Sequence, residues 1–311
     1  MSRLHVMVEE YLTVRRALGF KLAREHHLLV DFVEFLEEQG ADVITSALAV
    51  EWATLPKTAS PLWWSERLSK VRAFARYAQA IDPASEVPPV DLLPRVPTNR
   101  RRAEPYLYTD DEIASLLAAA MQMRRKASAP TCATLIGLLA VTGMRVGEAI
   151  ALDRGDVDLD HGVITVRHAK FDRARQVPLH QSAISALTNY VRWRDQQWPH
   201  PKSPSFFVAS QGSRLAYSVV STQFRGLVRV AGIKPRSPRC RPRIHDLRHV
   251  FTCRALEDWY RAGVDVEARL PVLSTFLGHA SPKATYWYLS ARPELLELAA
   301  ARLEASLGER S

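Results

Sequence analysis

The sequence of 311 residues contains little cysteine and no long apolar run. Its three cysteines, Cys132, Cys240 and Cys253, are too few and too scattered for a disulfide framework, so they favour a reducing cytosol. No apolar run approaches the ~20 residues that a membrane helix needs. The first residues mix acidic with apolar side chains and contain no signal-peptide core. These absences argue against a secreted or membrane protein, and we expect a cytoplasmic one.

Acidic residues are outnumbered by basic ones. Lys and Arg together number 42, whereas Asp and Glu number 33, which gives a formal net charge of +9. This excess favours a polyanionic partner, with nucleic acid first and a membrane surface second. The composition, 47% hydrophobic and 24% charged, is otherwise that of a globular protein with a core. The length suggests two domains.

The first part of the chain predicts a helical domain followed by a linker. Residues 1–81 predict helices only, because their apolar residues recur at helical spacing. Residues 82–105 are rich in proline, which blocks helix continuation and stiffens the chain. They also contain the basic run Arg100–Arg102. We therefore expect a Pro/Arg-rich linker between two domains.

The second part predicts a mixed domain and a final helix. Residues 106–290 open with Thr109–Glu112, a capping-box pattern. They then combine helices with two short strands, 162–167 and 176–179, on either side of a basic hairpin tip. Within the C-terminal segment 291–311, apolar residues follow one helical stripe. The predicted fold is mainly α with a small antiparallel β-sheet.

Three polar clusters in the second part indicate chemistry on a phosphodiester. They are the segments Thr142–Glu148, Arg243–His249 and Leu277–Tyr288. From these segments, two arginines, two histidines and a tyrosine are the candidates for one task. Arginine forms forked hydrogen bonds with phosphate oxygens and stays charged at any working pH. A phenol can attack phosphorus and keep the phosphate as an ester. Together these side chains suit covalent cleavage of a phosphodiester.

In this order, the motifs resemble the tyrosine recombinase (phage integrase) family over about residues 106–290. The resemblance implies an α+β catalytic domain, preceded by a helical, SAM-like core-binding domain over 1–81. It also implies that a tyrosine attacks the scissile phosphate, two arginines hold that phosphate, two histidines support binding and proton transfer, and a hairpin lysine is the general acid. The attacking tyrosine corresponds to Tyr288, nine residues after His279. The two arginines correspond to Arg145 and Arg248, the two histidines to His245 and His279, and the lysine to Lys170.

The resemblance extends to partners and assembly. It implies site-specific cleavage and rejoining of double-stranded DNA at inverted-repeat sites by a homotetramer, on the nucleoid, with no metal or cofactor. The biological role would be integration, excision or transposition of a mobile element, or Xer-like recombination. Glu148 lies one helical turn after Arg145 and is expected to orient it. The C-terminal helix, 291–311, is expected to dock either on a neighbouring protomer or on its own domain.

Other basic residues are candidates for contacts with the DNA backbone, with a solvated surface as the alternative interpretation. They are Arg67, Lys70, Arg72, Arg76, Arg100, Arg101, Arg102, Arg173 and Arg243. Tyr286 is a competing nucleophile, and His245, Asp246 and His249 offer an alternative metal site. Three other functions stay open at this point: type IB topoisomerase-like strand relaxation, a catalytically silent DNA-binding accessory protein of a mobile element, and a metal-dependent nuclease.

Overall fold

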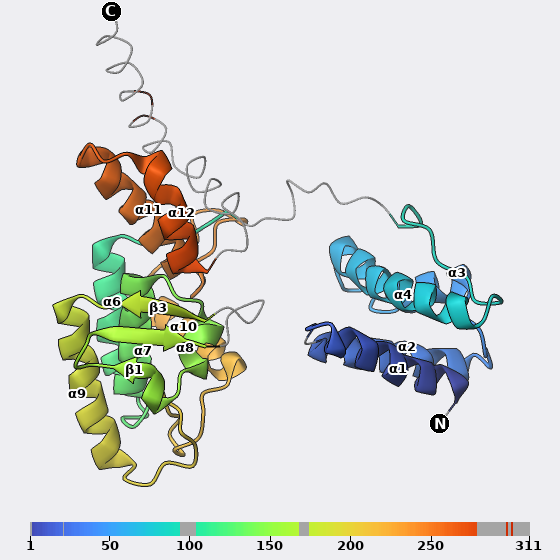
Figure 1. Ribbon diagram of the computed structural model, residues 1–311, viewed down its shortest axis with the longest axis horizontal. Coiled ribbons are helices and arrows are strands. Elements are labelled where there is room, and N and C mark those ends of the chain that lie inside the picture. The colour runs from blue at the N-terminus through green and yellow to red at the C-terminus, as the bar shows by residue number, and fades with distance from the viewer. Residues whose placement is uncertain are drawn as a thin grey trace, which may run out of the picture. The chain divides into compact units, whose positions relative to one another are not determined.

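The computed structural model describes residues 2–20, 22–93, 104–167 and 174–278, together with Glu297 and Ala300. The chain falls into two compact units, Met1–Ala103 and Glu104–Ser311. The division lies inside the segment expected to be a linker. Helices dominate the described ranges, and a three-stranded antiparallel sheet lies in the second unit (Figure 1). The predicted mainly α fold with a small antiparallel sheet is confirmed.

The first unit packs its helices around one apolar core. Large side chains such as Phe32, Trp52 and Phe74 are fully buried in it. The Ser2, Thr45 and Ser60 side chains accept hydrogen bonds from backbone N–H groups in the first turns of α1, α3 and α4. Polar caps therefore begin α1 (Arg3–Ala17), α3 (Ser46–Thr54) and α4 (Pro61–Ile81), whereas α2 (Ala23–Glu38) has no side-chain cap and packs through its apolar stripe.

The second unit begins with the predicted capping box. Thr109 Oγ1 accepts a hydrogen bond from the Glu112 N–H at 3.1 Å, and Glu112 Oε2 accepts one from the Thr109 N–H at 2.9 Å. These bonds satisfy backbone donors at the start of a helix. The helices of this unit are α6 (Asp110–Met121), α7 (Ala129–Thr142), α8 (Val146–Ala151), the 3-10 turn η1 (Arg154–Asp156), α9 (Gln181–Gln197), α10 (Tyr217–Val230), α11 (Asp246–Arg261) and α12 (Val266–Leu277).

The sheet has the strand order β1 (Val157–Asp158), β2 (Val163–Val166) and β3 (Arg175–Pro178). The β2–β3 register pairs Val163 with Pro178 and Val166 with Arg175. Alternate residues of β2 are buried, and in β3 Val177 is buried between two exposed neighbours, as in a sheet with one face on the core. The two predicted strands are confirmed, whereas β1 was not predicted because two residues are too few to show an alternating pattern.

Helix α12 also has no counterpart in the sequence prediction. Pro271 lies inside it, and an interior proline normally signals a helix end. Packing explains why the helix persists. Leu270, Leu273 and Leu277 of α12 are buried against Cys253 and Leu256 of α11. Figure 1 shows α11 and α12 side by side at one end of the second unit. Tertiary burial therefore outweighs the local proline signal, and α12 ends at Leu277, the first residue of the third motif.

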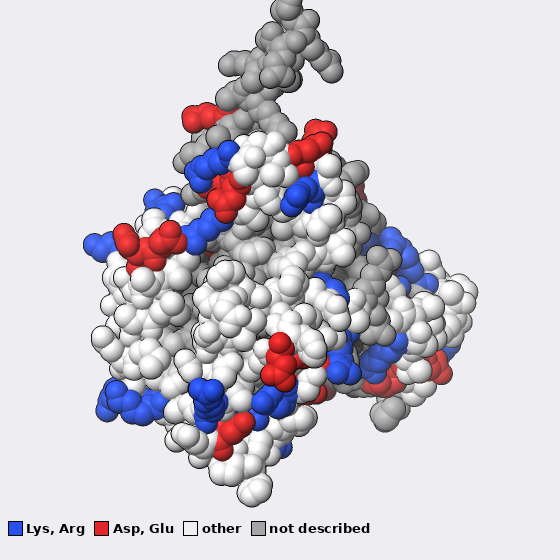
Figure 2. Space-filling model, turned by 60° about the vertical axis from the view of Figure 1, so that its left-hand side comes forward, with Lys and Arg blue, Asp and Glu red and all other residues white. Residues whose placement is uncertain are grey.

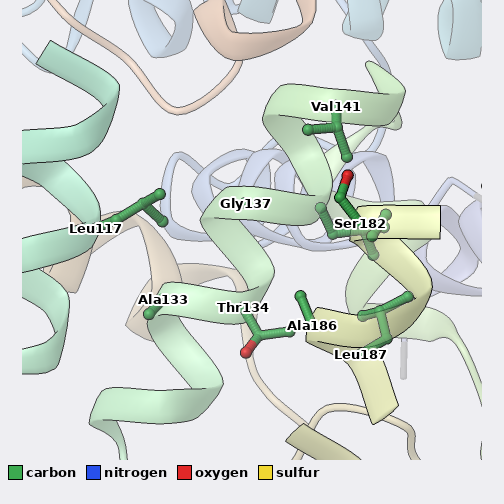
Figure 3. A pocket seen from close by; sticks show the side chains of 10 residues that line it. Leu117, Ala133, Thr134, Gly137, Val141, Ser182, Ala186 and Leu187 are labelled. Atoms are coloured by element: carbon green, nitrogen blue, oxygen red, sulfur yellow. The ribbon is translucent and has the colours of Figure 1, made fainter. Parts of the chain in front are cut away.

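An apolar cavity of about 330 Å³ lies between α7 and α9. Figure 3 shows Val141 and Ser182 at one end of it, with Thr134 and Ala186 further along. Arg145, His245 and Arg248, the predicted catalytic residues that the structure describes, are not among the residues that line it. The cavity is thus separate from the described part of the predicted constellation.

No helix in the described part of the chain is both long and apolar enough to cross a lipid bilayer.

Candidate active site

Gly143 ends α7 and redirects the chain toward the first motif arginine. It adopts a left-handed conformation with φ of +59°, which L-residues with a side chain rarely adopt. A Cβ atom at this position would lie 2.5 Å from Phe251 Cδ1 and 3.1 Å from Leu277 Cδ2. Arg145 follows two residues later and caps α8. The Thr-Gly-Met-Arg pattern is therefore a tight turn that delivers an arginine.

Arg145 is held by three groups. Its Nη1 donates to Glu148 Oε1 at 2.7 Å, and its backbone N–H donates to Glu148 Oε2 at 3.0 Å. Its Nη2 donates to the Gly278 carbonyl oxygen at 2.8 Å, and Nη1 lies 3.5 Å from the Leu277 carbonyl oxygen. About one third of the side chain, 32%, stays exposed. Arg145 is therefore fixed by a carboxylate and by the end of α12 while keeping access to solvent.

Arg248 reaches the same place from α11. Its Nη1 donates to the Gly143 carbonyl oxygen at 2.8 Å, and its Nη2 donates to the Leu277 carbonyl oxygen at 2.6 Å. The residue is 2% exposed. The guanidinium groups of Arg145 and Arg248 thus converge on the Leu277 carbonyl, one residue before Gly278. The structure therefore brings the two predicted arginines together with the start of the third motif.

His245 lies directly before α11, one turn from Arg248. Although the residue reaches solvent, burial lowers the pKa of its imidazole below the ordinary value. The positive charges of Arg248, Arg243 and Arg145 lower that pKa further. His245 is therefore neutral at pH 7 and can accept a proton.

Glu148 lies between two arginines. Its carboxylate contacts Arg145, as predicted, and also binds Arg175 of β3, with Nη2–Oε2 at 2.7 Å. Burial alone would raise the pKa of Glu148, but hydrogen bonds and charge from Arg175, and then from Arg145, outweigh it and lower the pKa. Glu148 is therefore ionised and binds both guanidinium groups.

Arg175 was not predicted to belong to this cluster. A signal was present, because residues two apart in a strand face the same side of a sheet. Arg175 is two residues before the fully buried Val177, and an inward-facing arginine requires a charged partner. That partner, Glu148, lies 27 residues away in the chain, so it could not be identified without the fold.

Arg243, a candidate DNA contact, forms a forked ion pair with Asp246. Its Nη2–Oδ1 distance is 2.7 Å and its Nε–Oδ2 distance is 3.1 Å. The hydrogen bonds to Asp246 raise the pKa of Arg243. Burial raises the pKa of Asp246, whose side chain is fully buried, against the opposing effect of Arg243. The Tyr108 hydroxyl donates to the Arg243 carbonyl oxygen at 3.1 Å. Arg243 therefore anchors the turn that precedes His245.

The four basic candidates of α4 differ in their surroundings. Arg67 is 8% exposed, lies over the Trp52 ring at 3.7 Å and donates to the Trp52 carbonyl oxygen at 3.0 Å. Lys70 pairs with Glu25 at 2.8 Å. Arg72 donates to the Pro88 and Pro89 carbonyl oxygens at 2.6 and 2.7 Å. Arg76 is exposed. This geometry favours a structural role for Arg67 and leaves Arg76 the most accessible of the four.

Several predicted residues lie outside the described ranges. They are Lys170, Arg173, His279, Tyr286, Tyr288 and Arg100, Arg101 and Arg102, together with the C-terminal segment 291–311 except Glu297 and Ala300. Within the ranges that are described, no group of three or more His, Cys, Asp or Glu side chains could hold a metal ion.

The charge on the surface is mixed. On the face shown in Figure 2, Lys and Arg side chains are interspersed with Asp and Glu, and uncharged residues cover most of the area. The net charge of +9 is therefore not gathered into one basic patch on this face. The concentration of positive charge relevant to a phosphate is a cluster of three arginines: Arg145 and Arg175 bind the Glu148 carboxylate, and Arg248 meets Arg145 at the Leu277 carbonyl.

Comparison with known proteins gives one family. The family model described as "Phage integrase family" matches residues 107–294. The chain is 42% identical over 317 residues to the "Putative integrase/recombinase y4rB" of Sinorhizobium fredii, across the full length of both proteins (100% of each). It is 31% identical over 154 residues to the "Tyrosine recombinase XerC" of Corynebacterium glutamicum, which covers 50% of this chain and 44% of that protein.

A solved structure shows the same fold. The Tn1549 transposon integrase in complex with a circular intermediate DNA superposes with a TM-score of 0.65 and covers 96% of this chain and 99% of that one. The sequences are 18% identical, so this likeness concerns the fold alone.

Proposed function

This chain belongs to the phage integrase family and is a tyrosine site-specific recombinase, and we propose that it cleaves and rejoins DNA through a 3′-phosphotyrosyl intermediate. The observation that carries the proposal is the convergence of Arg145 and Arg248 on the carbonyl of Leu277, the first residue of the third motif. Two fixed positive charges at one point suit a phosphate. A guanidinium binds an anionic phosphate oxygen more strongly than a neutral carbonyl oxygen, because both partners are then charged, so a phosphate oxygen would compete for these donors.

In the proposed cleavage step, the Tyr288 hydroxyl oxygen attacks the scissile phosphorus and the bond from phosphorus to the 5′-oxygen breaks. The phenol has an ordinary pKa of about 10, so its proton must be accepted during attack. The neutral His245 imidazole suits this role. Lys170 donates a proton to the leaving 5′-oxygen. Arg145 and Arg248 stabilise the negative charge that gathers on the phosphorane oxygens.

Rejoining follows from the same chemistry in reverse. One phosphate ester is exchanged for another, so the phosphotyrosyl bond conserves the energy of the broken strand. A 5′-hydroxyl from a second duplex attacks that bond and releases the Tyr288 phenol. Neither step consumes a nucleotide or a water molecule.

The proposed assembly is a homotetramer on DNA. Exchange between two duplexes cuts four strands, and each protomer supplies one Tyr288, so four protomers are required. Inverted-repeat sites suit such a symmetric complex. We propose that residues 1–81 form the core-binding domain and that the C-terminal segment, 291–311, docks on a neighbouring protomer. We also propose integration, excision or transposition of a mobile element as the role, on nucleoid DNA in the cytoplasm.

Covalent capture tests the proposed function. The full-length protein is mixed with a library of randomised duplexes, each carrying a nick that lets a short fragment escape after cleavage. Adducts that survive denaturing washes are sequenced, with and without excess EDTA. We expect a defined site with an inverted repeat, joined to protein through its 3′-phosphate, in equal yield with chelator. No adduct, or cleavage that requires added Mg²⁺, would reject the tyrosine mechanism in favour of a nuclease.

A further inference from the structure

Arg175 lies outside the three motifs, yet it contacts both α8 and the end of α12 beside Arg145. It is the first residue of β3 and pairs with Val166 of β2. Its guanidinium binds both oxygens of the Glu148 carboxylate, with Nη1–Oε1 at 3.2 Å and Nη2–Oε2 at 2.7 Å. Its Nε donates to the Phe276 carbonyl oxygen at 2.8 Å. Arg175 therefore joins β3 to α8 and to the end of α12.

The same guanidinium packs against the turn that ends α12. Gly278 adopts a left-handed conformation with φ of +66°. A Cβ atom at Gly278 would lie 2.8 Å from Arg175 Nη1. The carbonyl of Gly278 accepts a hydrogen bond from Arg145 at 2.8 Å. Arg175 thus lines the turn whose carbonyl positions Arg145.

The contact between Arg175 and Glu148 affects catalysis because it changes how much of the Arg145 charge is neutralised. If Glu148 paired with Arg145 alone, the carboxylate would neutralise the arginine that faces the phosphate. The Glu148 carboxylate instead binds the guanidinium groups of both Arg145 and Arg175, so two positive groups share one negative charge. The side chains of Arg175 and Glu148 are 8% and 6% exposed, so solvent screens these charges weakly.

We propose that Arg175 is a positioning residue for strand cleavage: it shares the Glu148 carboxylate, so that Arg145 is held in place without being neutralised. This inference rests on the proposed function. The competing interpretation is that Arg175 only stabilises the fold, as a buried arginine elsewhere does. Arg194 of α9 is such a residue, since its Nη1 donates to the Ser205 and Phe206 carbonyl oxygens at 3.3 and 3.2 Å.

Single-turnover cleavage by the full-length protein distinguishes the two interpretations. The probe is the nicked duplex captured by the wild-type protein, prepared with either a phosphodiester or a methylphosphonate at the scissile position. A methylphosphonate lacks the negative charge that Arg145 balances. Arg175→Met should cleave the phosphodiester about 100-fold more slowly, the effect expected of a small misplacement. On the methylphosphonate, the deficit should shrink at least about 10-fold, because less charge needs stabilisation.

Matched variants separate catalysis from folding. Arg175→Lys keeps the charge but loses the fork, and it should cleave the phosphodiester about 10-fold more slowly. Arg194→Lys should lower the melting temperature while leaving the cleavage rate of the folded protein unchanged. In a double-mutant cycle, Arg175→Met should add little to Glu148→Gln, because both act on Arg145. If Arg175→Met does not fold, Arg175→Lys and its cycle with Glu148→Gln supply the comparison.

The outcomes that overturn the inference are distinct from failure of the proposed function. A wild-type rate for a folded Arg175→Lys or Arg175→Met, or an equal deficit on both probes, would show that Arg175 is only structural. Additive effects in the cycle would show that it does not act through Glu148. Absence of covalent capture by the wild-type protein would instead remove the proposed function itself.

Discussion

Among single residues, His245 links the electrostatics of the site most directly to the reaction. Its imidazole is partly desolvated by the protein, and it lies near the positive charges of Arg248 and Arg145, which would bind a phosphate. Both effects lower its pKa, so the arrangement that attracts the anion also keeps His245 neutral. A neutral imidazole can accept the phenol proton, whereas a protonated one cannot.

This lowered pKa predicts the acid limb of the pH profile. Measured with limiting DNA and protein below saturation, the cleavage rate reports groups of the free protein. The rate should stay level as the pH falls through 6.5, the ordinary pKa of histidine, and decline only at lower pH. His245→Gln should cleave at least ~100-fold more slowly and lose this limb.

His161 provides the control for that profile. It is exposed and pairs with Asp158 at 2.8 Å in the turn between β1 and β2. His161→Gln should therefore leave both the rate and the limb unchanged. A wild-type midpoint above 6.5, or a limb that survives in His245→Gln, would contradict the assignment of His245 as the proton acceptor.

Among the secondary-structure elements, two helix ends build the site. Gly143 ends α7 and Gly278 ends α12, each in a left-handed conformation. Each exposes a carbonyl that an arginine holds, Arg248 at Gly143 and Arg145 at Gly278. The glycines of the two motifs thus have a physical reason, because only glycine turns the chain there without strain.

Substitution of Gly143 should therefore lower the unfolding free energy of the second unit. In Gly143→Ala the backbone strain adds to the close approach of Phe251, so we expect a loss of about 2 kcal/mol of unfolding free energy. The melting temperature should fall by roughly 4–8 °C for a unit of this size, as measured by thermal denaturation.

Gly147 in α8 is the matched control. It lies in a helix, and an added Cβ would meet nothing within 4 Å. Gly147→Ala should raise the unfolding free energy by about 0.5–1 kcal/mol, because alanine loses less entropy in a helix. If both variants had the same melting temperature, the left-handed turn would not be what requires glycine at 143.

How much of this could be predicted from the sequence depended on the range of each interaction. The capping box at Thr109 and the helices of the first unit follow from local patterns, and the structure confirms them. Helix α12 was missed because burial against α11 outweighs Pro271. The Arg175–Glu148 pair and the inward orientation of Arg67 over Trp52 were missed because both depend on tertiary contacts.

At the scale of the whole molecule, the described part of the predicted constellation lies in one unit. Arg145, Glu148, His245 and Arg248 all belong to Glu104–Ser311, which has its own apolar core. The first unit has a separate core, and three of its four candidate α4 bases engage groups within that unit. This division fits a protein in which one domain performs the chemistry. The proposed mechanism then depends on which tyrosine is the nucleophile.

The most direct measurement is to locate the phosphotyrosyl bond. Trypsin cuts after Lys283 and Arg302, but not after Arg292 because Pro293 follows it, so Tyr286 and Tyr288 fall in one peptide. Captured protein is digested with nuclease and trypsin, and fragmentation in the mass spectrometer places the nucleotide. We predict that it is on Tyr288, that Tyr288→Phe gives no adduct while binding DNA within a few-fold of wild type, and that Tyr286→Phe gives a normal adduct. A nucleotide on Tyr286, or an adduct that persists in Tyr288→Phe, would contradict the proposed mechanism.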